Sequence, residues 1–294
     1  MPTAETPTFA DLVPRLWLVG TVIACLPATT VALWLAVRWR LSGRPFPLPR
    51  DGAWPLVPWP AWFGLLLFGA VFSLMFLISS AWAVMAELDL LPWKPYGTPD
   101  LIISPGLFLS QLLPPALGLW LVTRLGPGAA ETIGVRAGQP WHDVLYGLGM
   151  TAAVVPLCVG AILVGALVHW LAGLPTVLHP VLVSIGESSS PWTLAAALVL
   201  ASVVAPLAEE FTYRGVLMMS LLRPLGGPGA IAVSSAVFAL VHLLIEPQAI
   251  LALFLLGLAL GYVTYRTRSL VAAVVAHSAF NTLMILGTFF CGSS

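Results

Sequence analysis

The sequence predicts an all-α fold, a polytopic transmembrane bundle of about eight spanning helices. The first observation behind this prediction is composition: 12 basic and 12 acidic residues make up only 8% of 294, against roughly 25% in an average soluble domain. The second is apolarity, because 59% of the residues are hydrophobic and the mean hydropathy is +0.98. So few charges could not cover the surface of a soluble protein of this size. A soluble enzyme and a disordered chain are therefore excluded.

The third observation is the recurrence of uncharged stretches along the chain, each about as long as the roughly 20 apolar residues that span a bilayer. The eight stretches are 16–37, 52–86, 101–123, 144–186, 188–208, 224–245, 247–265 and 269–294. The second predicts a helix that begins near Ala61, because three prolines precede that residue. The fourth predicts one helix over about 144–168 and an apolar loop, since Gly173, Pro175 and Pro180 break its second half.

The basic residues predict the orientation of the bundle. If the loops between eight helices alternate between two sides, one side receives only Arg15 and Lys94. The other side receives Arg38, Arg40, Arg44, Arg50, Arg124, Arg136, Arg214, Arg223, Arg266 and Arg268. Because basic loops stay in the cytosol, we expect both termini to face outward (N-out/C-out).

One apolar segment carries charges that the other segments avoid. Glu209, Glu210 and Arg214 interrupt residues 201–224, and a charge at the centre of a spanning helix costs about 2.5–3.5 kcal/mol on insertion scales. Glu210 and Arg214 are four residues apart and can pair on one helix face. Glu209 lies about 100° round the helix and has no local partner. A structural ion cluster at the cytoplasmic rim would explain the pair, but it explains Glu209 poorly.

Two histidines and an asparagine interrupt later apolar segments. His242 follows Phe238 by one helical turn, and Asn281 follows His277 by one turn on the same face. A lone buried histidine is more often a packing residue than a catalyst, and a lone asparagine more often joins two helices. The functional interpretation therefore depends on whether these residues converge with Glu209.

A glycine-rich turn around Gly226 predicts how the first two of these segments meet. Glu209 lies 17 residues before Gly226 and His242 lies 16 after it, so both are about 25 Å of helix from the turn. An antiparallel hairpin places them at nearly one depth if the helix of Glu209 runs on to about Arg223. His277 lies only about 12 Å into its helix. Either a deep, non-helical turn or a last helix that begins outside the bilayer would account for that difference.

Gly257 and Gly261 form a step of small residues on the seventh predicted helix. Small residues at this spacing let two helices approach closely. We expect them to pack against a neighbouring helix inside the bundle.

Three motifs in series carry a resemblance to a known family. The sequence reads EEFTYR at 209–214, FALVH at 238–242 and HSAFN at 277–281, which are intact copies of the motifs EExxxR, FxxxH and HxxxN. They resemble the CPBP family of intramembrane proteases, also called the CAAX-protease or ABI family, which includes the type II CAAX prenyl endopeptidase. The resemblance covers about residues 190–290.

The resemblance implies an endopeptidase that hydrolyses a peptide bond of a membrane-associated or prenylated-type substrate. Glu209 would be the general base that activates a water, which His242 would help to hold. His277 and Asn281 would donate hydrogen bonds to the tetrahedral oxyanion. Amide hydrolysis independently requires such groups, namely a proton acceptor for water and donors where negative charge develops.

The resemblance says nothing about residues 1–140, which leaves them unassigned beyond a scaffold, and it also names supporting residues. Residues 1–140 would be an N-terminal transmembrane scaffold of about three helices and loops, and residues 141–294 a CAAX-protease-like catalytic core. Glu210, Arg214 and Phe238 would support the site structurally.

We favour a metal-free, glutamate-based mechanism without a cofactor, and a zinc enzyme is the alternative. Glu209, His242 and His277 are the set that could hold zinc, as in His₂Glu sites. The HExxH signature is absent from the sequence. Asn281 is a poor zinc ligand and a good oxyanion donor.

Two other functions stay open: a non-catalytic CPBP-fold membrane protein, such as an immunity or sequestering factor, and a proton-coupled transporter. A binding scaffold has no need for all four candidate catalytic residues, and a transporter predicts matching broken helices in two halves, which the sequence lacks. The expected partners are a membrane protein or peptide substrate and the lipid bilayer. Nucleic acid is not expected, because the net charge is zero and no basic run exists. We expect an integral multi-pass protein of the plasma membrane and make no prediction of oligomeric state.

Overall fold

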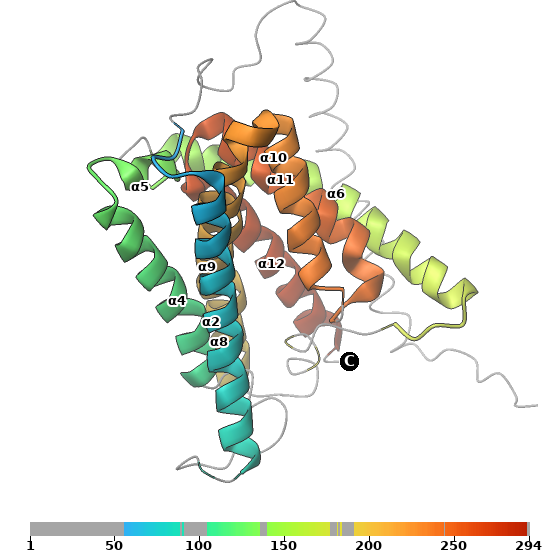
Figure 1. The fold of residues 1–294 in the computed structure, drawn as a ribbon. Coiled ribbons are helices and arrows are strands. Elements are labelled where there is room, and N and C mark those ends of the chain that lie inside the picture. The colour runs from blue at the N-terminus through green and yellow to red at the C-terminus, as the bar shows by residue number, and fades with distance from the viewer. Residues whose placement is uncertain are drawn as a thin grey trace, which may run out of the picture.

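The computed structural model describes residues 56–88, 90, 105–135, 140–176, 181, 183, 191–243 and 245–292, and within these ranges its elements are all helices. The first are α2 (Ala61–Glu87), α4 (Pro105–Arg124), α5 (Ala129–Thr132) and α6 (Pro140–Leu171). A continuous helical run follows, made of α8 (Pro191–Val199), η1 (Leu200–Val204), α9 (Ala205–Glu209), η2 (Glu210–Met218) and α10 (Met219–Val241). The last are the one-turn η3 (Pro247–Ala249), α11 (Ile250–Thr267) and α12 (Leu270–Gly292) (Figure 1).

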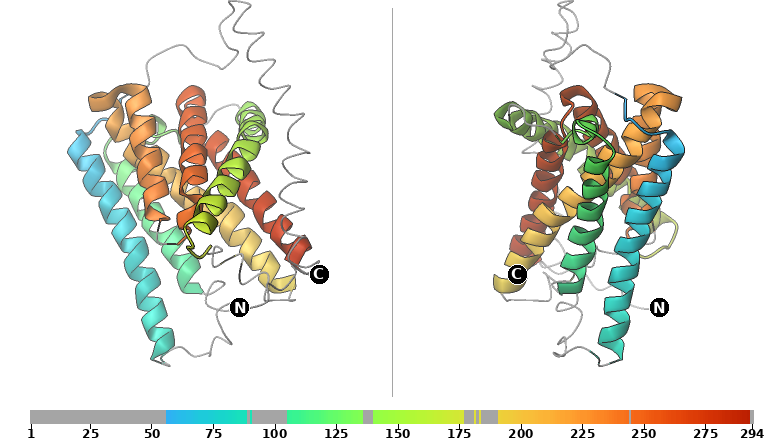
Figure 2. Two further views of the ribbon diagram at one scale, coloured as in Figure 1. Left: turned by 90° about the vertical axis from the view of Figure 1, so that its right-hand side faces the viewer. Right: turned by 60° about the vertical axis from the view of Figure 1, so that its left-hand side comes forward.

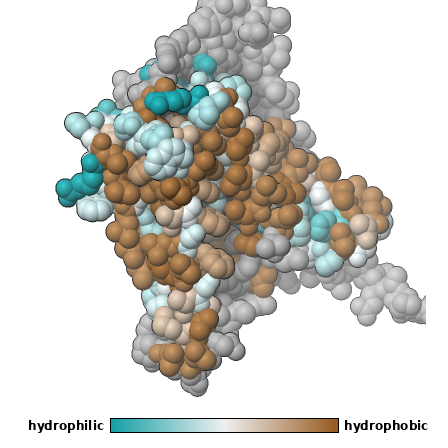
Figure 3. Space-filling view, in the orientation of Figure 1, coloured by the Kyte–Doolittle hydropathy of each residue, from teal (hydrophilic) through white to brown (hydrophobic). Residues whose placement is uncertain are grey.

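These helices are long and apolar enough to cross a membrane. The six candidate spans in the described ranges are Ala61–Ala86, Pro105–Arg124, Trp141–Leu171, Leu194–Val241, Pro247–Thr267 and Leu270–Gly287. Large apolar side chains such as Leu66 and Phe76 are exposed, and hydrophobic residues cover much of the face drawn in Figure 3. Lipid accommodates such a surface and water does not. The predicted all-α membrane bundle is confirmed, and the chain is an integral multi-pass membrane protein.

The predicted count of eight spanning helices is not confirmed. The first predicted helix, 16–37, lies outside the described residues. Each of the other seven predicted stretches contains a helix, but 188–208 and 224–245 both lie in the single helical segment Leu194–Val241. The one helix expected over about 144–168 is α6, which ends at Leu171.

The long helical segment folds back on itself at a glycine (Figure 2). Gly226 has φ 67° and ψ 177°, and glycine adopts this positive φ without a steric penalty. The helix that carries Glu209 therefore runs on past Arg223 before it turns, as predicted. The first arm of the hairpin also contains two π-helical stretches, η1 and η2, which the sequence did not predict.

Two glycines let α11 approach the second arm of the hairpin closely. A Cβ atom placed on Gly257 would lie 2.9 Å from Cβ of Ser235, and one placed on Gly261 would lie 3.0 Å from Cγ2 of Ile231. The predicted packing of this step inside the bundle is therefore confirmed. The close approach also brings the backbone carbonyl of Gly257 toward η2.

The described residues form two large apolar cores, and η2 contributes to the first. The first joins α2, α4 and α5 to η2 and α10, and it includes Val71 and Phe211. The second joins α6, α11 and α12, and it includes Val159 and Leu256. Helices α2 and α4 thus pack directly on the segment that carries the candidate site. The domain boundary between residues 140 and 141 stays a prediction.

One end of the bundle collects the basic helix ends. The backbone N–H of Leu270 donates to the carbonyl of Gly134 at 3.1 Å, which joins the loop after α5 to the start of α12. Gly227, beside the hairpin turn, lies against Tyr265 near the end of α11. The basic residues of these helix ends are Arg124, Arg223, Arg266 and Arg268. Their grouping agrees with the predicted sidedness, while the assignment of this end to the cytosol and the N-out/C-out orientation stay predictions.

Candidate active site

Glu209 is the last residue of α9, and its side chain is 19% exposed, so it is neither sealed nor on the surface. Its Oε2 lies 3.8 Å from Nε2 of His277. This distance is too long for a direct hydrogen bond, but a water bonded to both atoms can bridge it. The π-helical winding of η2 begins at the next residue, and such stretches are rare and frequent at functional sites.

Glu210 and Arg214 form a buried ion pair. Nη1 of Arg214 donates to Oε1 of Glu210 at 3.0 Å, and both side chains are 0% exposed. Nη2 donates to the carbonyl of Gly257 at 3.3 Å, and the guanidinium carbon lies 4.7 Å from the ring centre of Phe238. The predicted pairing is confirmed. The placement of Arg214 among the loop arginines is wrong, because the helix continues to Gly226 and buries it.

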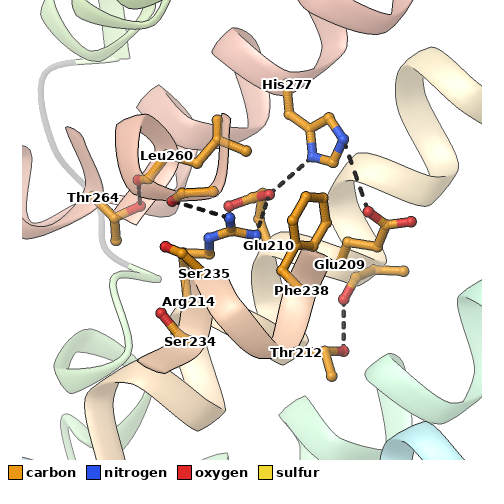
Figure 4. Close-up of polar contacts among 12 residues, drawn as sticks. Glu209, Glu210, Thr212, Arg214, Ser234, Ser235, Phe238, Leu260, Thr264 and His277 are labelled. Atoms are coloured by element: carbon orange, nitrogen blue, oxygen red, sulfur yellow. Dashed lines mark hydrogen bonds and ion pairs between the residues drawn. The ribbon is translucent and has the colours of Figure 1, made fainter. Parts of the chain in front are cut away.

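His277, on α12, lies between the carboxylates of two adjacent residues (Figure 4). Its Nδ1 is 2.9 Å from Oε1 of Glu210, and its Nε2 faces Glu209. An ionised carboxylate can only accept a hydrogen bond. The Nδ1–H group of His277 therefore donates to Glu210, and Nε2 is the nitrogen presented toward Glu209.

Phe238 joins the two histidines. Its ring centre lies 5.8 Å from that of His277, with the planes at 86°, and 5.0 Å from that of His242. Nδ1 of His242 is 2.8 Å from the carbonyl oxygen of Phe238, so His242 donates there and keeps Nε2 for other contacts. The structure thus brings Glu209 and Glu210 to the two nitrogens of His277, and the ring of Phe238 contacts the rings of both histidines.

These contacts show how His277, near the start of its helix, meets the hairpin. It contacts Phe238, which lies one turn closer to Gly226 than His242 does. Within the described hairpin the non-helical backbone is confined to Gly226, and the depth of this turn in the bilayer stays a prediction.

Asn281 has a helix-joining contact. Its Nδ2 donates to the backbone carbonyl of Ala201, in η1, at 2.7 Å. A contact of this kind, in which an asparagine joins two helices, is the non-catalytic interpretation that the sequence left open for Asn281. An amide carries two N–H donors, so the predicted role of Asn281 as an oxyanion donor would use the second one, and that role stays a prediction.

Glu209, His242 and His277 are the residues that would hold a metal. Both histidines donate Nδ1–H to an oxygen and present Nε2, an arrangement common among metal-binding histidines. In the part of the chain that the structure describes, no group of three or more His, Cys, Asp or Glu side chains is arranged to hold an ion. The preference for a metal-free site stays a prediction.

The contact between Glu210 and His277 was not expected from the sequence, which assigned Glu210 to Arg214 alone. The available signal was the pair of adjacent carboxylates itself. Side chains of two adjacent helical residues point in directions about 100° apart. They can therefore contact the two nitrogens of one imidazole ring that lies between them.

Comparison with known proteins gives a family match over this region. A family model described as type II CAAX prenyl endopeptidase Rce1-like matches residues 191–283. Neither the curated proteins nor the solved structures gave a match. The matched segment runs from the start of α8 into α12 and contains every residue of the cluster described above. Over residues 191–283, the chain is therefore similar to the type II CAAX prenyl endopeptidase Rce1-like family, which agrees with the resemblance to CAAX-type intramembrane proteases that its three motifs carry.

Proposed function

We propose that this protein is an intramembrane endopeptidase in which Glu209 activates the water that cleaves a peptide bond. The substrate is a membrane-associated or prenylated protein or peptide, and the site of action is the plasma membrane. The family match supports protease chemistry. The observation that carries the mechanism is the position of Glu209, a partly exposed carboxylate whose Oε2 lies 3.8 Å from Nε2 of His277.

A water held between Glu209 and His277 would contact the carboxylate of Glu209, which accepts protons, and Nε2 of His277. Glu209 takes one proton from this water as its oxygen attacks the carbonyl carbon of the substrate. When the C–N bond of the tetrahedral intermediate breaks, Glu209 returns the proton to the leaving amine. The products are a new carboxylic acid, which keeps the second proton of the water, and a new amine; the two ionise to a carboxylate and an ammonium group.

The remaining polar groups are proposed to stabilise the water and the intermediate. His242 helps to hold the water, and His277 and Asn281 contact the oxyanion. Nε2 is the nitrogen left for these tasks in each histidine, since Nδ1 already donates to Glu210 or to the carbonyl of Phe238. In a neutral ring this Nε2 accepts a hydrogen bond from the water, and it donates to the oxyanion only when the ring has taken up a second proton. Such contacts are stronger between apolar helices than in water. The mechanism proposed here uses no metal.

The alternative is a non-catalytic membrane protein of this family that binds or sequesters a partner. Such a protein would need the buried pair of Glu210 and Arg214 for its fold. It has no use for a second, partly exposed carboxylate beside that pair, which favours catalysis.

Glu209→Gln tests the proposal in the full-length protein, reconstituted in lipid nanodiscs and assayed with a fluorogenic farnesylated peptide. The amide has the same size but accepts no proton, so we expect kcat to fall by about 100-fold or more with an unchanged thermal midpoint. Glu131→Gln makes the same change on an exposed residue of α5 and should keep the wild-type rate. Full activity in Glu209→Gln would contradict the proposal.

Elemental analysis of the same preparations tests the metal-free part of the mechanism. We expect no stoichiometric zinc in the wild-type protein. Stoichiometric zinc that is lost in His242→Ala would replace the proposed mechanism by a zinc-dependent one.

A further inference from the structure

Glu210 makes more contacts than a structural ion pair needs. Its Oε1 accepts from Nη1 of Arg214 at 3.0 Å and from Nδ1 of His277 at 2.9 Å. Its Oε2 is buried and has no hydrogen-bond partner among the described residues, and the same holds for Nε of Arg214. One oxygen therefore accepts both hydrogen bonds while the other accepts none.

This geometry is not the one that best suits an arginine and a carboxylate alone. Such a pair is most stable when two parallel N–H groups meet both oxygens, and a buried oxygen without a partner is unfavourable. In this site Arg214 instead turns Nη2 toward the carbonyl of Gly257. The orientation of the Glu210 carboxylate is thus set by His277 as much as by Arg214.

We propose that Glu210 is a positioning residue for the reaction, which fixes the tautomer and direction of His277 so that Nε2 faces Glu209. The inference rests on the proposed function. Arg214 holds the carboxylate, the carboxylate holds Nδ1–H, and the ring of Phe238 packs at 86° against the imidazole. Together these contacts oppose a flip of the ring.

The tautomer of His277 determines whether Glu209, the proposed general base, can accept a proton from water. If the neutral imidazole carried its proton on Nε2, a small side-chain shift that shortened the present 3.8 Å separation would let His277 donate directly to Glu209. The carboxylate would then be occupied and the place for the water would close. By keeping the proton on Nδ1, Glu210 leaves Glu209 able to accept a proton from water.

Two double variants separate positioning from stability. Glu210→Met with Arg214→Met replaces the buried ion pair by apolar side chains, an exchange that buried pairs often tolerate, and it removes the acceptor for Nδ1. Glu210→Gln with Arg214→Met removes the same two charges but keeps an amide oxygen as the acceptor. A purely structural pair predicts the same kcat for both.

We expect the double methionine variant to lose about 100-fold in kcat, with KM unchanged. The glutamine variant should recover at least about tenfold of that loss. Equal kcat values for the two variants at similar thermal midpoints would overturn the proposal.

The tautomer of His277 gives a readout that does not depend on cleavage. In wild-type protein labelled with ¹⁵N-histidine, with the signals assigned by their loss in His277→Gln, we expect the neutral ring to carry its proton on Nδ1. In the double methionine variant the proton should move to Nε2. A wild-type ring protonated on Nε2 would overturn the proposal even if neither double variant folds. If the farnesylated peptide is not cleaved, the proposed function fails, and the tautomer still decides the role of Glu210.

Discussion

Helices α2 and α4 differ from the hairpin and α12 in how they use the apolar interior. The described parts of α2 and α4 hold no charged residue before their last position, and they contact η2 through apolar groups such as Val71. The hairpin and α12 bury Glu210, Arg214 and His277 in contact with one another. Because unpaired charges are costly inside a membrane, the buried charges of the hairpin and α12 contact one another, and the proposed active site lies where they meet. Helices α2 and α4 contribute apolar contacts.

The largest effect expected from this difference is on stability at the buried ion pair. Arg214→Ala leaves the carboxylate of Glu210 buried without its main partner, which should lower the free energy of unfolding by about 3–5 kcal/mol. Arg124→Ala, at the exposed end of α4, is the matched control and should change it by less than about 0.5 kcal/mol. Denaturant or thermal unfolding of detergent-solubilised protein measures both. Equal losses would remove the distinction between the two regions.

A smaller effect is expected where α2 meets the hairpin. A side chain at Gly64 would overlap Ser220 of α10, so Gly64→Val should destabilise the protein by about 1–3 kcal/mol through overpacking. Gly69→Val is the control on the same helix, because a Cβ there would meet no atom within 4 Å. Since α2 supplies no catalytic group in the proposed mechanism, kcat per folded molecule should not change in either variant. A fall in kcat without a fall in stability would give α2 a role beyond support.

The same division explains what could be predicted from the sequence. Apolar stretches bounded by charges predicted the helices, because only a helix satisfies its backbone in lipid. Gly226 predicted the turn, because the flanking segments on either side are both helix-forming. The pairing of Glu210 with Arg214 followed from their spacing of four residues. Each of these predictions uses local information.

The contacts that the sequence did not predict depend on how the helices are rotated and tilted. That Glu209 and Glu210 reach opposite nitrogens of His277 depends on the winding of η1 and η2, and no residue pattern distinguishes π-helical from α-helical hydrogen bonding here. Asn281 shares a helix face with His277, yet it bonds the carbonyl of Ala201, because η1 lies alongside that part of α12. The motifs therefore identified segments that meet in the structure, without giving the contacts between them.

The smallest effect concerns a polar contact between the two regions. Nε1 of Trp59, just before α2, donates to the hydroxyl of Ser220 at 3.1 Å, and this pair is buried. Trp59→Phe and Ser220→Ala, alone and together, form a double-mutant cycle, in which we expect a coupling of about 0.5–1.5 kcal/mol. Trp62→Phe is the control, because it replaces the indole of an exposed tryptophan by the same phenyl ring. It should show no coupling to Ser220→Ala. A coupling of zero for Trp59 would mean that apolar packing alone holds α2 against the hairpin at this position.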